Sequence, residues 1–366
     1  MIYIYIYIYI YIMKILILTD GHINNGGYST IADVIYKNIN DKYDVDFYTF
    51  ILTNASNFES HEIHIEDCNN DLLTYRNLNS KFNKKYNVII CTSPWAFYIS
   101  SLFFNKIRTI YIKGGGLKTD KYITNLSDTY ILNTNVDNYL DLLTITLEKK
   151  ATDNLIKYVV IPSTNLVYEI LMKSSNYKYI KDSLTTSLNF AWFENKLINN
   201  TNIEKEYDLI FVVSDHKRIV KNSSFAYKIF ETNPNLTKIV IGMNCEHYNI
   251  LPNTTVINKY IENNEVKKMF KKSRILLVPS YYDSGPSTIV EAVLQNCISI
   301  CYHNCGFSLL NINCLVMKNI DVQKWNYSIH NTLLDFDKIE FNNIQSYIKN
   351  SVNDDVDLFF NIIISD

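Results

Sequence analysis

The chain has 366 residues, of which 47% are hydrophobic and 20% are charged. A chain of this length can form two or three domains and bury a large core without metal or disulfide support, and its hydrophobic content excludes disorder as the main state. Lys and Arg total 35 against 37 Asp and Glu, and this near-neutral balance argues against a general nucleic-acid binder, which normally carries a basic excess.

The N-terminal residues form a low-complexity run. Ile and Tyr alternate strictly over residues 2–12, and an ordinary sequence begins at Met13. No basic segment precedes the run and no small-residue cleavage site follows it, so it lacks the pattern of a signal peptide. It is also shorter than the ~20 apolar residues that a membrane-spanning helix needs. We therefore expect residues 1–12 to be an extension outside the fold, and we expect no membrane span.

Strands and helices alternate along residues 13–182, the expected N-terminal domain. Lys14–Leu18 is a continuous apolar run, as in a strand buried on both faces of a parallel sheet. A loop with Gly26 and Gly27 follows, and then the amphipathic segment Ser29–Ile39. The alternation predicts a doubly wound α/β domain. Its further expected strands and helices are Tyr43–Phe50, Val88–Cys91, Arg108–Lys113, Thr129–Leu132, Leu140–Glu148 and Val167–Lys173.

Residues 183–206 are mostly polar and are expected to link this domain to a second one at 207–366. The second region also alternates between strands and helices, which predicts two Rossmann-like domains facing each other across a cleft. Ligands of such folds bind at the carboxyl ends of the parallel strands. Its expected elements are Asp208–Val213, Phe225–Thr232, Lys238–Gly242, Thr255–Ile257, Asn263–Lys271, Ile275–Pro279, Ser287–Gln295 and Ile298–Cys301.

The loop after the expected strand Ile275–Pro279 has the features of an anion site. The loop contains Asp283, and Ser287 can cap the helix that follows. Backbone N–H groups in such a loop and in the first helical turn attract anions. Glu291 lies one turn further on, and a carboxylate beside an anion site suits sugar or ribose hydroxyls. The residues expected to bind the ligand through this loop and helix start are Ser284, Gly285 and Ser287.

This segment resembles the signature of retaining GT-B glycosyltransferases (glycosyl transferases group 1 type), which use nucleotide-diphosphate sugars. Their signature has two acidic residues separated by seven others, and the matching residues here are Asp283 and Glu291. The resemblance implies that the first contacts the donor sugar and that the second holds the ribose hydroxyls. The family usually has Glu at the first position, where this chain has the shorter Asp.

A basic pair supports the same resemblance. Arg218 and Lys221 follow the expected strand Asp208–Val213, where the family has Arg and Lys a few residues apart. A diphosphate leaving group gains negative charge as the glycosidic bond breaks, and a guanidinium and an ammonium can stabilise that charge. The resemblance also implies that Gly26 and Gly27 let the backbone approach the donor phosphate.

We therefore expect a glycosyltransferase that moves a sugar from a nucleotide-diphosphate sugar to a hydroxyl group of a glycan, lipid or protein acceptor. The resemblance implies that the domain at 13–182 binds the acceptor and that the domain at 207–366 binds the nucleotide sugar. It also implies retention of the anomeric configuration and no metal or other cofactor, with Arg218, Lys221 and Asp283 as the catalytic residues. Two alternatives remain open: a catalytically inactive sugar- or nucleotide-binding module, and another GT-B enzyme such as a sugar-nucleotide epimerase. Nucleic acid is not an expected partner.

The seven cysteines lack the paired spacing of a disulfide framework, which favours a reducing compartment and a cytoplasmic protein. Cys297 and Cys301 flank or lie within an expected buried strand, where we expect core thiols rather than zinc ligands. Asp44 and Asp46 match the Asp-x-Asp metal motif of the GT-A transferase fold. Because they fall inside an expected strand, we expect no metal site there.

Overall fold

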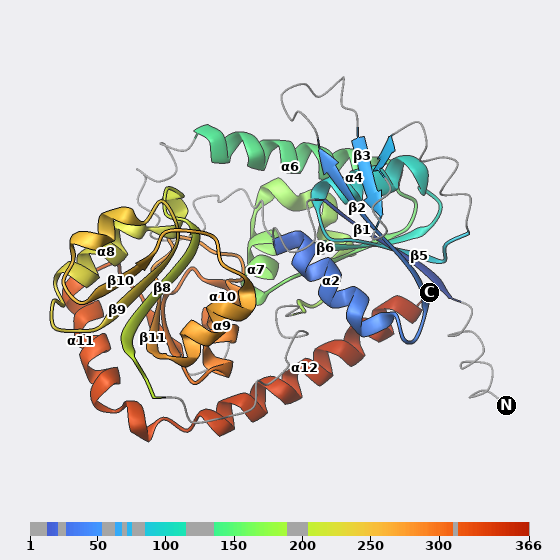
Figure 1. Ribbon diagram of the computed structural model, residues 1–366. Helices are drawn as coiled ribbons and strands as arrows, with labels where there is room; N and C mark the ends of the chain where they lie inside the picture. The colour runs from blue at the N-terminus through green and yellow to red at the C-terminus, as the bar shows by residue number, and fades with distance from the viewer. Residues whose placement is uncertain are drawn as a thin grey trace. The chain divides into compact units, whose positions relative to one another are not determined.

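The computed structural model describes residues 13–20, 27–52, 63–67, 72–74, 85–114, 135–188, 204–309 and 314–365 (Figure 1). The chain divides into two compact units, one of Met1–Glu194 with Asp354–Asp366 and the other of Asn195–Asn353. Each unit is built on one largely parallel sheet with helices on its faces, which confirms the expected α/β class with two Rossmann-like units. No helix within the described ranges is long and apolar enough to cross a membrane. The expected extension 1–12 and the expected strand Thr129–Leu132 lie outside the described residues.

The first unit holds a seven-stranded sheet in the order β4-β3-β2-β1-β5-β6-β7. Its strands pair in parallel, except that β3 pairs antiparallel with both β2 and β4. The strands are β1 (Lys14–Asp20), β2 (Asp44–Leu52), β3 (Ile63–Asp67), β4 (Leu72–Thr74), β5 (Val88–Cys91), β6 (Arg108–Lys113) and β7 (Tyr158–Pro162). The helices are α2 (Gly27–Ile39), α4 (Pro94–Phe103), α6 (Asn135–Asn154), α7 (Asn165–Lys173) and the 3₁₀ segment η1 (Ser175–Ser183).

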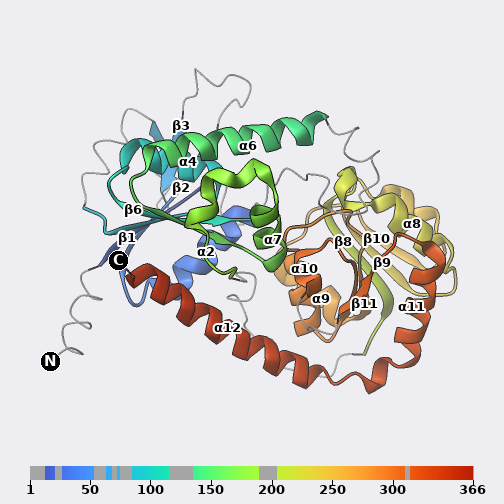
Figure 2. The ribbon, with the colours of Figure 1, turned by 180° about the vertical axis from the view of Figure 1, so that it is seen from behind.

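Short-range signals in the sequence explain where these elements lie. Ile15, Leu16, Ile17 and Leu18 of β1 are fully buried, because helices cover both faces of the sheet. Ser93 caps α4 by accepting a hydrogen bond from the backbone N–H of Ala96 (3.1 Å), and Thr164 caps α7 in the same way. Figure 2 shows the sheet from behind, with α4 and α6 on one face.

The C-terminal helix α12 (Phe341–Ile364) ends in the first unit. From the sequence we expect residues 354–366 in the second domain, but Phe359 and Ile363, four residues apart on one helix face, are buried in the core of the first unit. Arg108 donates a hydrogen bond from Nη1 to the carbonyl oxygen of Ile363 (3.0 Å). The expected linker at 183–206 also starts too early, because Leu188 is buried in the same core. The burial of these apolar side chains therefore places residues 354–366 in the first unit and moves the end of its N-terminal part beyond Leu188.

The second unit holds a six-stranded sheet in the order β10-β9-β8-β11-β12-β13, and all of its strands are parallel. The strands are β8 (Tyr207–Asp215), β9 (Lys238–Met243), β10 (Thr254–Ile257), β11 (Ser273–Val278), β12 (Ile298–Tyr302) and β13 (Cys314–Met317). The α-helices are α8 (Ser223–Glu231), α9 (Asn263–Lys271), α10 (Ser287–Leu294), α11 (Val322–Leu334) and the start of α12. The 3₁₀ turns are η3 (Ile219–Lys221), η4 (Glu246–Ile250), η5 (Gly306–Leu309) and η6 (Phe336–Lys338).

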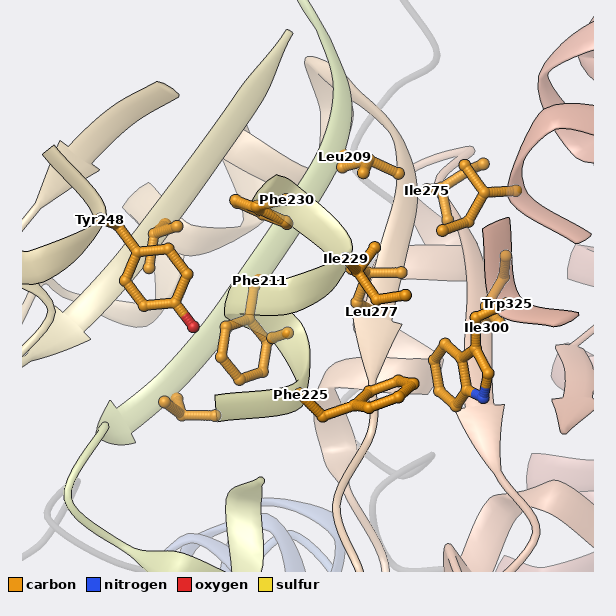
Figure 3. Packing of buried hydrophobic residues seen from close by; sticks show 14 of the residues in the cluster. Leu209, Phe211, Phe225, Ile229, Phe230, Tyr248, Ile275, Leu277, Ile300 and Trp325 are labelled. Carbon is orange, nitrogen blue, oxygen red and sulfur yellow. The ribbon is translucent and has the colours of Figure 1, made fainter. Parts of the chain in front are cut away.

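Aromatic packing fills the core on one face of this sheet (Figure 3). Trp325 of α11 is fully buried and meets Phe225 of α8 edge to face, with 5.2 Å between the ring centroids. Both rings lie against strand residues such as Leu277 and Ile300. Helices α8 and α11 therefore form one layer on the sheet, and α9 and α10 lie on the other face (Figures 1 and 2). The two layers fix the strands whose carboxyl ends carry the expected site.

Gly242 generates a testable prediction about this fold. It is the penultimate residue of β9, with φ +141°, and a Cβ atom there would lie 1.8 Å from the carbonyl oxygen of Val213. We expect Gly242→Ala to lower the free energy of unfolding by about 1–3 kcal/mol from backbone strain alone, with the steric overlap adding to this loss. Urea titration measures it. The control is Met243→Ala, whose side chain is 45% exposed and which should change stability by no more than about 0.5 kcal/mol. Equal stability of the two variants would contradict the prediction.

Candidate functional site

The expected site residues of the second unit follow two neighbouring strands. β8 ends at Asp215 and β11 ends at Val278, and the two strands pair in parallel, so their loops leave from the same edge of the sheet. From β8 the chain builds β9 and β10 on one side, and it then returns to form β11 on the other side. This pair is the topological switch point of the sheet. Open α/β sheets bind ligands outside the carboxyl ends of their strands at such a point.

Backbone and side-chain hydrogen bonds join the loops after β8 and β11. Asn222 follows η3 in the left-handed conformation (φ 54°), which Asn tolerates better than most residues. Its Nδ2 donates to the carbonyl oxygen of Pro279 (3.2 Å). The N–H of Tyr281 donates to the carbonyl oxygen of Val220 (2.9 Å). The two loops therefore hold each other in place.

Lys221 and Asp283, both expected in the site, form an ion pair between these loops. The Lys221 Nζ donates to Asp283 Oδ2, and the side chains are 19% and 14% exposed respectively. The structure thus brings together two expected residues that lie 62 positions apart in the chain. Because both side chains keep some exposure, the pair lies at the surface of the loops and a ligand can reach it.

Arg218 differs from Lys221 in its surroundings. It immediately precedes η3 and is exposed, and within the described ranges no residue holds its guanidinium. A guanidinium offers planar paired donors that match phosphate oxygens. Asp283 therefore offsets the charge of Lys221, whereas no described carboxylate offsets the charge of Arg218.

Helix α10 begins at Ser287, directly after the β11 loop. From the sequence we expect Ser287 to cap this helix, but Pro286 holds the N-cap position, where no side chain caps the first turn. Pro lacks a side-chain acceptor, so the N–H groups of Ser287 and Thr288 keep their capacity for an anionic ligand, while the N–H of Ile289 donates to the carbonyl oxygen of Pro286 (3.0 Å). The residues between strand and helix, Ser284 and Gly285, are partly exposed, and the Gly285 N–H donates to Asp283 Oδ1 (3.3 Å).

Glu291 lies in the second turn of α10 and is partly exposed. Its Oε1 accepts a hydrogen bond from Nδ2 of Asn263, the first residue of α9 (3.5 Å). Asp283, by contrast, is bound by residues of the loops after β8 and β12. The two expected acidic residues therefore have different surroundings, as two different roles require.

Comparison with known proteins identifies this architecture. No family model and no curated protein sequence matches the chain. Among solved structures, sucrose-phosphate synthase from Thermosynechococcus elongatus matches with a TM-score of 0.64 and 13% identity over 94% of each chain. Anabaena HepE in complex with UDP and glucose matches with a TM-score of 0.66 and 13% identity over 96% of this chain and 99% of that one. T4 phage BGT in complex with UDP and Mn²⁺ matches with a TM-score of 0.53 and 12% identity over 96% of this chain and 100% of that one.

The chain has the GT-B fold. At 11–13% identity these similarities establish the architecture alone. Within this GT-B fold the described site residues belong to the second unit. Of the expected glycine pair in the first unit, Gly27 is the first residue of α2, and Gly26 lies outside the described residues.

The two hypotheses about metal sites can be compared with the geometry. Asp44 and Asp46 lie in β2, as expected, and both carboxylates pair with Lys14, at 2.9 and 3.6 Å. Cys297 and Cys301 are buried, as expected for core thiols, and burial raises the pKa of Cys297 to about 12. Among the described residues, no group of three or more His, Cys, Asp or Glu side chains is arranged to hold a metal ion.

His216 is a site-loop residue that the sequence analysis missed. It follows β8 two residues before Arg218 and is buried, with edge-to-face contacts to Phe211 and Tyr248. Its Nε2 lies 3.3 Å from the carbonyl oxygen of Ile241, and its backbone N–H donates to Met243. Burial lowers its pKa to about 4. His216 therefore anchors the start of the loop to β9. The signal that could have identified it is a histidine directly after a buried strand.

We expect His216 to make stability depend on pH. Its pKa is about 4 in the folded chain and about 6.5 in the unfolded one, so between these values the unfolded chain binds more protons. Its contribution is therefore fully present above pH 6.5 and is lost as the pH falls toward 4. His216→Gln should reduce the loss of unfolding free energy between pH 6.5 and 4.5, measured by urea titration. His330→Gln, at an exposed position on α11, is the control. An unchanged pH slope in His216→Gln would show that this histidine does not titrate as described.

Proposed function

We propose that the protein is a glycosyltransferase that uses a nucleotide-diphosphate sugar as donor and a hydroxyl group as acceptor. One observation carries this proposal. Arg218 and Lys221 follow β8, the uncapped start of α10 follows β11, and the two strands end at the same edge of the second sheet. An anionic ligand of an α/β sheet binds at such a switch point. The solved structures with this fold support it, because HepE contains UDP and glucose and BGT contains UDP.

The donor diphosphate is the group that this edge suits best. Arg218 supplies two parallel N–H donors and Lys221 supplies an ammonium group, and the N–H groups near Ser287 add neutral donors. Ser284 and Gly285 supply backbone close to the same phosphates. Glu291, with its carboxylate oriented by Asn263, accepts hydrogen bonds from the ribose hydroxyls.

The reaction needs no nucleophile from the protein. The acceptor oxygen forms a bond to the anomeric carbon while the bond from that carbon to the diphosphate oxygen breaks. The nucleoside diphosphate leaves with the electron pair, and the hydroxyl proton passes to it. Charge on the leaving group is greatest during bond cleavage, so Arg218 and Lys221 act mainly on the transition state. We propose retention at the anomeric carbon, a glycan, lipid or protein acceptor, and a cytoplasmic setting that suits the protein's free cysteines.

A two-stage experiment tests the function. Thermal-shift measurements with UDP, ADP and GDP identify the base, because a ligand that binds only the folded state raises the melting temperature. The matching nucleotide sugars are then incubated with the protein, and the release of nucleoside diphosphate is measured with and without candidate acceptors. Release supports the transferase. Binding without release indicates an inactive binding module, and an isomerised nucleotide sugar indicates an epimerase.

Arg218→Ala should reduce turnover by about 10²–10³-fold and change nucleoside diphosphate affinity much less, because leaving-group charge peaks in the transition state. Steady-state kinetics and isothermal titration separate the two effects. Arg274→Ala is the matched control, since Arg274 lies near the amino end of β11 and pairs with Asp208 (2.9 Å). Normal turnover in Arg218→Ala would remove this residue from the catalytic group.

Glu291→Gln should mainly weaken nucleotide binding, by about 1–3 kcal/mol, because the amide keeps the shape of the side chain but loses the charged acceptor that ribose hydroxyls prefer. Isothermal titration with the nucleoside diphosphate measures the loss. Glu265→Gln on the exposed surface of α9 should bind as the wild type does. Wild-type affinity in Glu291→Gln would contradict the ribose assignment.

We expect turnover to survive removal of divalent cations, because two basic side chains and a helix start can together neutralise a diphosphate. Activity is measured after dialysis against EDTA and again after addition of Mn²⁺ or Mg²⁺. Less than a twofold change is expected. Loss of activity with EDTA and recovery with Mn²⁺ would show that a metal ion carries part of this role.

A further inference from the structure

Hydrogen bonds from three different loops fix Asp283 in place. Its backbone N–H donates to Asn304 (3.2 Å) and its carbonyl oxygen accepts from Gly306 (2.8 Å), both in the loop after β12. Its carboxylate accepts from Lys221 through Oδ2 and from the N–H of Gly285 through Oδ1. The loops after β8, β11 and β12 therefore meet at this residue. With the main chain held on both sides, the carboxylate has one defined position without any ligand.

Lys221 gains its position from this carboxylate. A lysine side chain is a flexible four-carbon stem that ends in an ammonium with three N–H donors. The bond to Asp283 uses one donor and restricts the stem, so two donors keep their capacity for a phosphate group. Arg218, exposed and without such a partner among the described residues, is not oriented in this way.

We propose that Asp283 is a positioning residue that holds Lys221 against the donor diphosphate, and that it is not a ligand of the donor sugar. This inference rests on the proposed function and assigns Asp283 a role different from the one that the sequence resemblance implies. The shorter Asp side chain suits the role, because its carboxylate stays close to the loop backbone and to Lys221.

The proposal predicts the direction of each effect. A carboxylate beside the diphosphate repels the bound nucleotide, so removing its charge should not weaken nucleotide binding. The same change releases Lys221, and a misplaced catalytic group costs turnover. If Asp283 instead bound the donor sugar, its substitution would have a different effect. It would weaken the binding of the nucleotide sugar and leave the binding of the nucleoside diphosphate unchanged.

The test uses Asp283→Asn, Lys221→Met and the double variant, with turnover from steady-state kinetics and affinities for the nucleoside diphosphate and the nucleotide sugar from isothermal titration. We expect Asp283→Asn to lose about 10- to 100-fold in turnover. Its affinity for the nucleoside diphosphate should stay within twofold of the wild type or become tighter. The affinity ratio, which is the dissociation constant of the nucleotide sugar divided by that of the nucleoside diphosphate, should not change. In the Lys221→Met background, Asp283→Asn should change turnover less than twofold.

Asp208→Asn is the matched control. Asp208 pairs with Arg274 (2.9 Å) and joins the same two strands, β8 and β11, at their opposite ends. The turnover of its folded fraction should equal that of the wild type. If Asp283→Asn does not fold, Lys221→Met provides the second measurement: the ratio of the two affinities should stay within twofold of the wild type.

Two results would overturn the proposal. In the first, Asp283→Asn weakens the binding of the nucleotide sugar alone, and its effect on turnover adds to that of Lys221→Met. The same conclusion would follow if Lys221→Met tightened the binding of the nucleotide sugar relative to the nucleoside diphosphate, because the freed carboxylate would then bind the sugar. In the second, the wild-type protein neither binds nucleoside diphosphates nor turns over their sugars, which also overturns the proposed function. The wild-type measurement therefore separates the two failures.

Discussion

The ion pair between Lys221 and Asp283 joins loops that leave two adjacent parallel strands, and the candidate site of the second unit depends on this arrangement. β8 and β11 are adjacent because the chain reverses its direction of travel across the sheet between them. Without this pairing, the cations of the loop after β8 and the carboxylate of the loop after β11 would have no fixed position relative to each other. The backbone bond from Tyr281 to Val220 and the side-chain bond from Asn222 to Pro279 hold the same two loops together. The donor groups therefore meet before any ligand binds.

A second lysine–carboxylate pair, in the first unit, shows what distinguishes the pair at the switch point. Lys113 ends β6 and donates to Glu148 of α6 (2.6 Å), and both side chains are fully buried. Glu148 also accepts from the hydroxyls of Tyr111 and Tyr179, each at 2.6 Å. A buried pair whose hydrogen bonds are satisfied ties its elements together and has no surface for a ligand. Lys221 and Asp283 keep some exposure, which a ligand contact requires.

The sequence predicts most strands of the two sheets and proposes the site residues, but it does not predict the contacts between those residues. Apolar runs such as Val88–Cys91 locate strands well, because both faces of these parallel sheets are covered. The ion pair of Lys221 with Asp283 depends on strand order, which no local pattern encodes. Phe359 and Ile363 fit either domain by periodicity, and only the core of the first unit shows where they are buried. Pro286 takes the N-cap position expected for Ser287, because the exact start of a helix depends on the loop that leads into it.

We expect a nucleoside diphosphate to bind at the carboxyl edge of the second sheet, between the loops after β8 and β11. Hydrogen–deuterium exchange with and without the nucleoside diphosphate that gives the largest thermal shift tests this location directly. We expect slower exchange in the peptides that cover residues 214–222 and 280–291, and unchanged exchange in those that cover the amino ends of the same strands. Protection elsewhere in the chain, with none in these two loops, would show that the nucleoside diphosphate binds at another place.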